Sequence, residues 1–167
     1  MHFHAEHRFS GTVQSVVEVL ADPDCYVGLA LPDVSQPEVL EHHSEGNSTT
    51  VRLRYEFTGS LDPIARRLLG AKRPAWIQEV SVDASAAAGT ITFEAERDPK
   101  RLHGSGRFTL SPSGDGTVRR LDGELVVAVP GIGRMAERRI VPGLLRRLDI
   151  EAQALEQRIG SGGSSAG

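Results

Sequence analysis

The stretch ELVVAVPGIGRMAERRI, residues 124–140, joins an apolar strand pattern to a helical pattern through a turn with two glycines. The spacing of Gly131, Gly133 and Ala136 matches G-x-G-x-x-A, the fingerprint of a dinucleotide-binding loop. That fingerprint has meaning only in a βαβ unit, with an acidic residue on a second parallel strand about 20 residues later. No second strand pattern follows here. The glycines are therefore predicted to turn the chain sharply and to let the helix approach the strand closely.

Strand patterns occupy most of the chain before this turn. The segment HFHAEHRF alternates, with Phe3, Ala5, His7 and Phe9 on the side predicted to face inward. From Glu38 onward, apolar residues recur at every second position between clusters of turn residues, which predicts an antiparallel sheet with one buried face. The predicted strands are 2–9, 37–44, 48–58, 74–83, 88–97, 104–111 and 117–129.

Helical patterns flank the strands. Thr12 is a candidate cap for a helix that breaks at Asp22-Pro23, so two short helices are expected after the first strand. The segment 62–74 is predicted to be a loop with one or two helical turns, a candidate lid or rim. Because proline costs about 3 kcal/mol inside a helix, Pro142 is expected to divide the C-terminal helix into 131–141 and 143–159.

The C-terminal helix carries an apolar stripe that is expected to face the core. Arg146, Arg147 and Asp149 lie off this stripe and are expected to face solvent, so substitution of Arg147 is predicted to change stability little. The stripe consists of Val141, Leu144, Leu145, Leu148, Ala152, Leu155 and Ile159.

Composition excludes several classes of protein. A net charge of −3 and a pI near 6.1 argue against non-specific binding of nucleic acid. No apolar run is long enough to span a bilayer, so no stable membrane insertion is expected. The first ten residues lack the features of a secretory signal, and the single cysteine, Cys25, rules out an intrachain disulfide. A cytoplasmic protein with a small buried cysteine is predicted.

The order of these elements resembles the helix-grip fold of the START-like, or SRPBCC, superfamily, which includes the birch-pollen allergen, lipid-transfer domains and bacterial polyketide cyclases. The local matches are VVEVLADPDCYVGL at 16–29, GSGRFTL at 104–110 and VAVPGIGRMAE at 127–137; the last two look like an uncharacterised bacterial branch. The resemblance implies an α+β fold in which a curved antiparallel sheet of about seven strands wraps around a long C-terminal helix. It covers a single domain at 1–159, followed by a flexible Gly/Ser tail at 160–167.

In this superfamily the space between sheet and helix is a pocket for hydrophobic small molecules. The resemblance thus implies an apolar site with a few polar groups, here Gln78 and the Tyr55 hydroxyl. The same side chains could instead fill a core. The residues predicted to bind a ligand are Tyr55, Phe57, Trp76, Gln78, Phe93, Phe108, Leu125, Leu144 and Leu148.

No catalytic motif accompanies the fold. His7 and His103 are the candidates for a general base near a pocket, but neither shows a carboxylate partner in the sequence. A G-x-S-x-G elbow is absent, and Cys25 lacks the context of a catalytic thiol. His2, His4 and Glu6 share one strand face, with His42-His43 expected on a neighbouring strand, yet this pattern is a weak metal signal. No catalytic residue, metal site or cofactor is predicted.

Three functions remain open at this point, as does the oligomeric state. The preferred hypothesis is a binding module for a hydrophobic or amphipathic small molecule, held between the sheet and the C-terminal helix. The first alternative is a polyketide cyclase or dehydratase in which His7, Tyr55 or His103 moves protons, which requires two ionisable groups to converge in a cavity. The second is a protein-interaction domain like the chaperone activators of the superfamily, which requires an exposed apolar patch.

Overall fold

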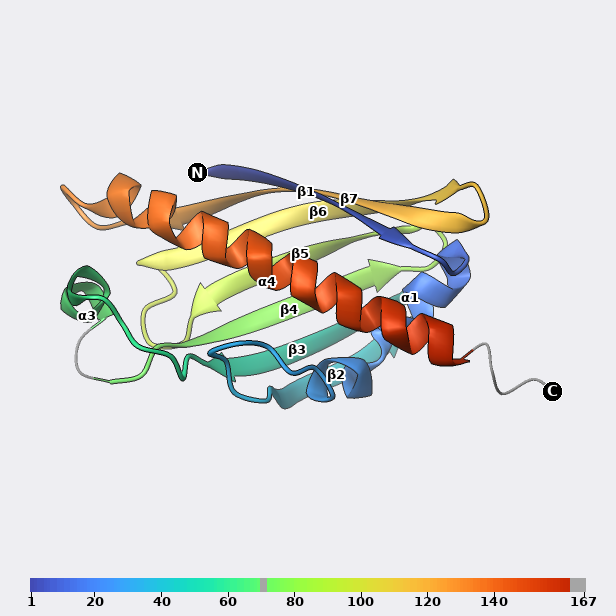
Figure 1. Cartoon of the computed structure of the whole chain (residues 1–167), viewed down its shortest axis with the longest axis horizontal. Coiled ribbons are helices and arrows are strands. Elements are labelled where there is room, and N and C mark those ends of the chain that lie inside the picture. The colour runs from blue at the N-terminus through green and yellow to red at the C-terminus, as the bar shows by residue number, and fades with distance from the viewer. Residues whose placement is uncertain (70–71, 163–167) are drawn as a thin grey trace.

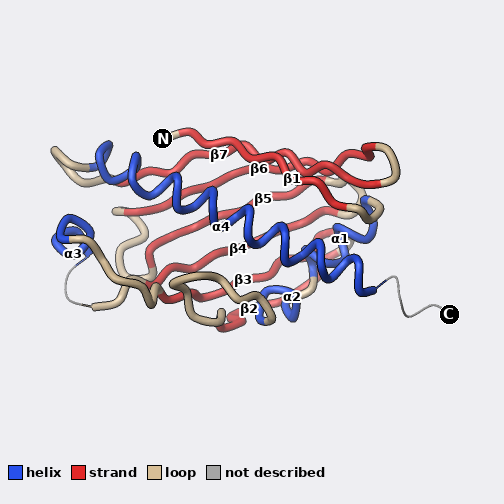
Figure 2. The backbone as a smooth tube through the Cα atoms, viewed as in Figure 1, coloured by secondary structure: helices blue, strands red, loops and turns tan. Residues whose placement is uncertain are grey.

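Seven antiparallel strands form one curved sheet, and the long C-terminal helix lies across one of its faces (Figures 1 and 2). The computed structural model describes residues 1–69 and 72–162. The strand order is β1-β7-β6-β5-β4-β3-β2. The elements are β1 (His2–Phe9), α1 (Val13–Ala21), α2 (Pro23–Val27), β2 (Glu38–Glu45), β3 (Ser48–Glu56), α3 (Pro63–Leu69), β4 (Ala75–Asp83), β5 (Ala88–Ala95), β6 (Leu102–Ser113), β7 (Gly116–Val127) and α4 (Gly133–Gly162).

The alternation in the strands separates a buried face from a wet one. In β1 every second residue is buried, and β3 follows the same rule through Val51, Leu53 and Tyr55. We call the buried face, which α4 covers, the inner face, and the opposite side the outer face. β2 differs, since all eight of its residues are exposed and it forms one edge of the sheet. The predicted strands agree with the observed ones to within a few residues at each end.

The two short helices form as their sequence signals require. The Thr12 side chain accepts a hydrogen bond from the Ser15 amide and so caps α1. Asp22 ends α1 and caps α2, where Pro23 occupies the first turn. α1 then contacts α4 and the strands of the central sheet. Cys25 is buried beside this junction, and burial raises the pKa of its thiol to about 11, as expected for a packing residue.

The geometry of the connection from β7 to α4 explains why it requires two glycines. Gly131 has a φ of +80°, a conformation that side chains disfavour. A Cβ on Gly133 would lie 2.2 Å from the Val127 carbonyl oxygen, so only glycine permits this approach of helix and strand. The Glu137 carboxylate also accepts a hydrogen bond of 3.0 Å from the Val127 amide. Since β7 pairs antiparallel with both of its neighbours, the turn does not open a βαβ unit.

α4 is one helix of 30 residues, and the prediction of a break at Pro142 was wrong. Pro142 lies ten residues into the helix on its exposed side, while Val141 and Leu148 are buried against the sheet. Apolar burial on both sides of the proline offsets the lost hydrogen bond. The helix also includes residues 160–162, which were expected in the tail; 163–167 lie outside the described residues. No described helix combines the length and apolar character that crossing a bilayer demands.

Candidate functional site

The inner face gathers four of the residues predicted to bind a ligand. Tyr55 of β3 lies opposite Trp76 of β4 in the sheet register, and Gln78 lies opposite Phe93 of β5. The rings of Tyr55 and Trp76 stack with their centroids 5.4 Å apart. These four side chains therefore form one patch beneath the middle of α4.

The other five predicted residues lie around this patch or away from it. Leu125 shares a cross-strand row with Phe93 through Gly104, whereas Phe108 pairs with Gly89 and Leu121, two rows further along the sheet. Phe57 follows the end of β3 and is half-buried. From α4, Leu148 is buried in the core and Leu144 packs against its edge.

Arg147 occupies the centre of the patch, so the prediction that it faces solvent was wrong. Only 8% of the residue is exposed. Its guanidinium lies 4.8 Å from the ring centroid of Tyr55, 5.4 Å from that of Trp76 and 5.7 Å from that of Phe93. One amino group donates a hydrogen bond to the Gln78 side-chain oxygen. The sheet curls around a wider sector of α4 than the apolar stripe marks, and this sector includes Arg147.

Glu151 lies one turn further along α4 and is also buried, with 1% exposed. Its carboxylate forms an ion pair with Arg147 at 3.5 Å. Sequence reasoning missed Glu151 because a charged residue beside an apolar stripe is ordinarily assigned to solvent. The available signal was the i, i+4 spacing of Arg147 and Glu151.

We call Tyr55, Gln78, Arg147 and Glu151 the interior polar cluster. Each has one buried polar atom without a hydrogen-bond partner among the described residues: the Tyr55 hydroxyl, Gln78 Nε2, Arg147 Nε and Glu151 Oε2. Leaving one such atom unsatisfied costs about 1–3 kcal/mol. Glu151 Oε2 still forms the 3.5 Å ion pair with Arg147, and Arg147 partly offsets the rise in the pKa of the Tyr55 hydroxyl, so these atoms are incompletely bonded and not isolated. Four such atoms in one place mark a candidate site.

The cluster is closed in this structure. Tyr55 and Gln78 have exposed fractions of 0%, so no water-sized space touches their side chains. Burial raises the pKa of the Tyr55 hydroxyl, with the Glu151 charge as a second cause, so this hydroxyl stays protonated and can donate a hydrogen bond. A molecule that reached these atoms would have to displace side chains that now fill the space between the sheet and α4.

His7 lies beside the cluster and has the carboxylate partner that the sequence did not reveal. Its Nε2 lies 3.0 Å from Asp149 Oδ1, and its Nδ1 lies 3.0 Å from an amino group of Arg119. A guanidinium can only donate, so Nδ1 accepts and Nε2 carries the proton. Burial, and then the Arg119 charge, lower the pKa of His7. His103 is exposed on the outer face, so the two histidines do not converge as the catalytic hypothesis requires.

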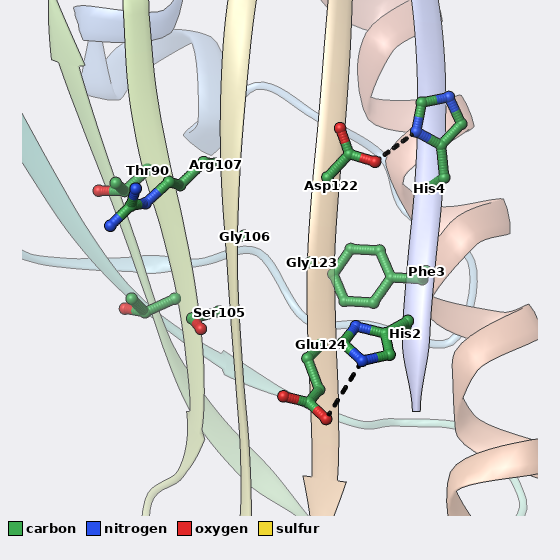
Figure 3. A pocket seen from close by; sticks show the side chains of 11 residues that line it. His2, Phe3, His4, Thr90, Ser105, Gly106, Arg107, Asp122, Gly123 and Glu124 are labelled. Carbon is green, nitrogen blue, oxygen red and sulfur yellow. Dashed lines mark hydrogen bonds and ion pairs between the residues drawn. The ribbon is translucent and has the colours of Figure 1, made fainter.

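A hollow of about 880 Å³ lies on the outer face, over strands β1, β7, β6 and β5 (Figure 3). Two exposed histidine–carboxylate pairs stand along it: His4 with Asp122 at 2.8 Å, and His2 with Glu124 at 3.8 Å. Thr90, Ser105 and Arg107 line the other side. Solvent screens both pairs, in contrast to the interior polar cluster.

The histidines do not assemble into the metal site that the sequence pattern raised. β1 and β2 form opposite edges of the sheet, so the expectation that His42 and His43 neighbour His2 and His4 was wrong. Among residues 1–69 and 72–162, no three His, Cys, Asp or Glu side chains are arranged to hold a metal ion.

Solved structures share this fold at low sequence identity. The chain is similar to TTHA0849 from Thermus thermophilus, with a TM-score of 0.68, 17% identity, and coverage of 98% of this chain and 100% of that one. It is similar to the Zhui aromatase/cyclase from Streptomyces sp. R1128, with a TM-score of 0.65, 16% identity, and coverage of 100% and 98%. Ara h 8.0201 gives a TM-score of 0.65, 10% identity, and coverage of 96% and 98%.

These likenesses confirm the helix-grip fold expected from the resemblance to the START-like superfamily. A search of curated protein sequences finds no match. Residues 4–159 match the family described as "Protein of unknown function (DUF2505)", and the chain therefore belongs to that family.

Proposed function

We propose that this protein binds an amphipathic small molecule between the sheet and α4. The observation that carries the proposal is the interior polar cluster, where four incompletely hydrogen-bonded polar atoms lie beside three aromatic rings. A site of this kind offers a large apolar surface and a few groups that fix orientation. A core selected for stability alone would have apolar residues at these positions.

The aromatic rings of Tyr55, Trp76 and Phe93 would contact the apolar body of the ligand, and the cluster its polar end. Phe57, Phe108, Leu125, Leu144 and Leu148 would extend the apolar wall on either side. The fold is compatible with this role, since one structure of the same fold is described as an aromatase/cyclase. We place the protein in the cytoplasm, in keeping with its single buried thiol.

The alternatives have less support. His7 hydrogen-bonds with Asp149 and Arg119, and no hydrogen bond joins it to the Tyr55 hydroxyl, so the two do not form an acid–base pair. The large apolar residues that are exposed in the described part of the chain are Val39 and Leu40 on β2 and Met135 on α4. Two adjacent residues on an edge strand and one on a helix do not form a patch of several hundred Å².

The two tyrosines of the chain provide a matched test. Both are fully buried, but the Tyr26 hydroxyl donates a 2.8 Å hydrogen bond to the Leu20 carbonyl, whereas the Tyr55 hydroxyl makes no hydrogen bond of ordinary geometry with the described residues and interacts with the Arg147 guanidinium. Tyr55→Phe should leave stability unchanged or higher and weaken binding of amphiphiles. Tyr26→Phe should cost about 1 kcal/mol of stability and leave binding intact.

Binding is measured by native mass spectrometry of the purified protein and by titration with amphiphiles, with Trp76, the single tryptophan, as the fluorescent reporter. Saturable binding that Tyr55→Phe weakens and Tyr26→Phe does not would support the proposal. Absence of binding across aliphatic and aromatic amphiphiles, or equal effects of the two substitutions, would refute it.

A further inference from the structure

The interior charges do not balance. The buried charged residues of the described chain are Arg119, Arg147 and Glu151, which amount to two guanidinium groups and one carboxylate. His7 is held neutral where it accepts a hydrogen bond from Arg119, and its other partner, Asp149, has a side chain that is 60% exposed. The interior therefore carries one positive charge in excess. Burial of an uncompensated charge is costly, so a partner of opposite charge is favoured there.

The unsatisfied atoms point to the same chemistry. The Gln78 amide nitrogen and Arg147 Nε can only donate, the Tyr55 hydroxyl can donate or accept, and Glu151 Oε2 is the one atom of the four that can only accept. A carboxylate offers two oxygen atoms with about four acceptor positions and one negative charge. It matches both the surplus of donors and the surplus of positive charge.

The surroundings of Arg147 define what the rest of the ligand must be. Its guanidinium lies against the rings of Tyr55, Trp76 and Phe93, and the buried core of the sheet continues beyond them. A group bound there lies beside an apolar wall and far from water. The carboxylate must therefore belong to a molecule with a large apolar body.

We propose that the ligand is an amphipathic carboxylic acid whose carboxylate pairs with Arg147, Gln78 and Tyr55. This inference rests on the function proposed above and adds the chemistry of the polar end. A competing ligand is an alkylammonium ion that displaces the Arg147 guanidinium from among the three rings and pairs with Glu151. The experiment distinguishes the two.

The test uses three probes with the same twelve-carbon chain: dodecanoate, dodecan-1-ol and dodecyltrimethylammonium, each below its critical micelle concentration. Binding is followed by Trp76 fluorescence and by calorimetry at neutral pH. Dodecanoate should bind about ten to a hundred times more tightly than the alcohol, the range expected for hydrogen bonds to a charged group. The ammonium probe should bind no better than the alcohol.

Variants of two adjacent arginines test whether the interior polar cluster causes the preference for dodecanoate over the alcohol. Arg147→Met removes the charge and keeps an apolar stem, and Arg146→Met makes the same change at an exposed position of α4. Arg147→Met should abolish the preference for dodecanoate over the alcohol, and Arg146→Met should retain it. Should Arg147→Met fail to fold because Glu151 loses its partner, Arg147→Met/Glu151→Gln removes both charges and should likewise abolish the preference.

The possible failures are distinct. If none of the three probes binds, the proposed function itself fails. If all three bind equally, or the ammonium binds best, or the preference for dodecanoate survives in the folded Arg147 variants, the protein binds amphiphiles and the carboxylate assignment is wrong.

Discussion

Two Arg–Glu pairs lie on opposite faces of the sheet. The exposed pair has the shorter contacts, and the buried pair has the longer one. On the outer face, Arg54 contacts Glu96 through two hydrogen bonds of 2.5 and 3.1 Å, and roughly a third of each side chain is exposed. On the inner face, Arg147 and Glu151 approach only to 3.5 Å, yet both are buried. The pair with the shorter hydrogen bonds is therefore the one in which water can replace either partner.

The difference shows which pair serves stability and which serves function. An exposed pair gains little because water solvates both partners almost as well when they are apart. The inner pair loses that solvation and leaves atoms unsatisfied, so it is a net cost that the rest of the fold must offset. A costly, incompletely bonded cluster inside a fold that elsewhere buries apolar residues indicates a role other than packing.

The largest expected effect comes from breaking the inner pair. Glu151→Gln keeps the size of the side chain but leaves Arg147 and Arg119 without a buried carboxylate. We expect the free energy of unfolding to fall by about 3–5 kcal/mol, measured by chemical denaturation. Replacing both partners, as in Arg147→Met/Glu151→Leu, should recover much of this loss, although Arg119 still lacks a buried carboxylate. If the double variant is as unstable as Glu151→Gln, the pair stabilises the fold and the contrast between the two faces is lost.

The apolar contacts of α4 should matter nearly as much. Leu148 is 1% exposed, so Leu148→Ala should lower the free energy of unfolding by about 2–5 kcal/mol through lost burial and a cavity. Leu40→Ala on β2, where 43% of the residue is exposed, is the matched control and should change it by less than about 0.5 kcal/mol. Thermal and chemical denaturation measure both. Equal effects would show that α4 is held by something other than its apolar stripe.

How much of this could be predicted from the sequence depends on the kind of signal. Period-two alternation around Tyr55 and Gln78, and the cap at Thr12, were sufficient for the strands and short helices, because those signals are local. The predicted helix break at Pro142 was wrong because the burial of apolar residues of α4 outweighs the local cost of the lost backbone hydrogen bond. Arg147 and Glu151 were missed for a related reason: their burial depends on how far the sheet curls around α4, which no local pattern encodes. The sequence was therefore sufficient to predict the aromatic wall of the candidate site, but not its two buried charges.

Because of His7, the stability of the folded protein should depend on pH. Its pKa is lowered in the folded protein, above all by burial and then by Arg119, so the unfolded chain binds its proton more tightly. Stability is therefore full above the unfolded pKa of about 6.5 and falls as pH drops below it, by at most about 1.4 kcal/mol per pH unit. Denaturation between pH 7.5 and pH 5 should show this slope, and His7→Gln should flatten it. A slope that persists in His7→Gln would assign the effect to another group.

The smallest effect is expected at the outer pair. Glu96→Gln makes the same chemical change as Glu151→Gln but on an exposed carboxylate, whose pKa is lowered mainly by its hydrogen bond with Arg54. We expect a loss of less than about 1 kcal/mol at low salt, which fades at high salt as ions screen the pair. Parallel denaturation curves of the two variants at both salt concentrations are the measurement. The two sites differ in exposure and in bond length, and burial is expected to dominate. A salt-independent loss at Glu96 as large as that at Glu151 would mean that bond length, and not burial, determines the energetics of such pairs in this fold.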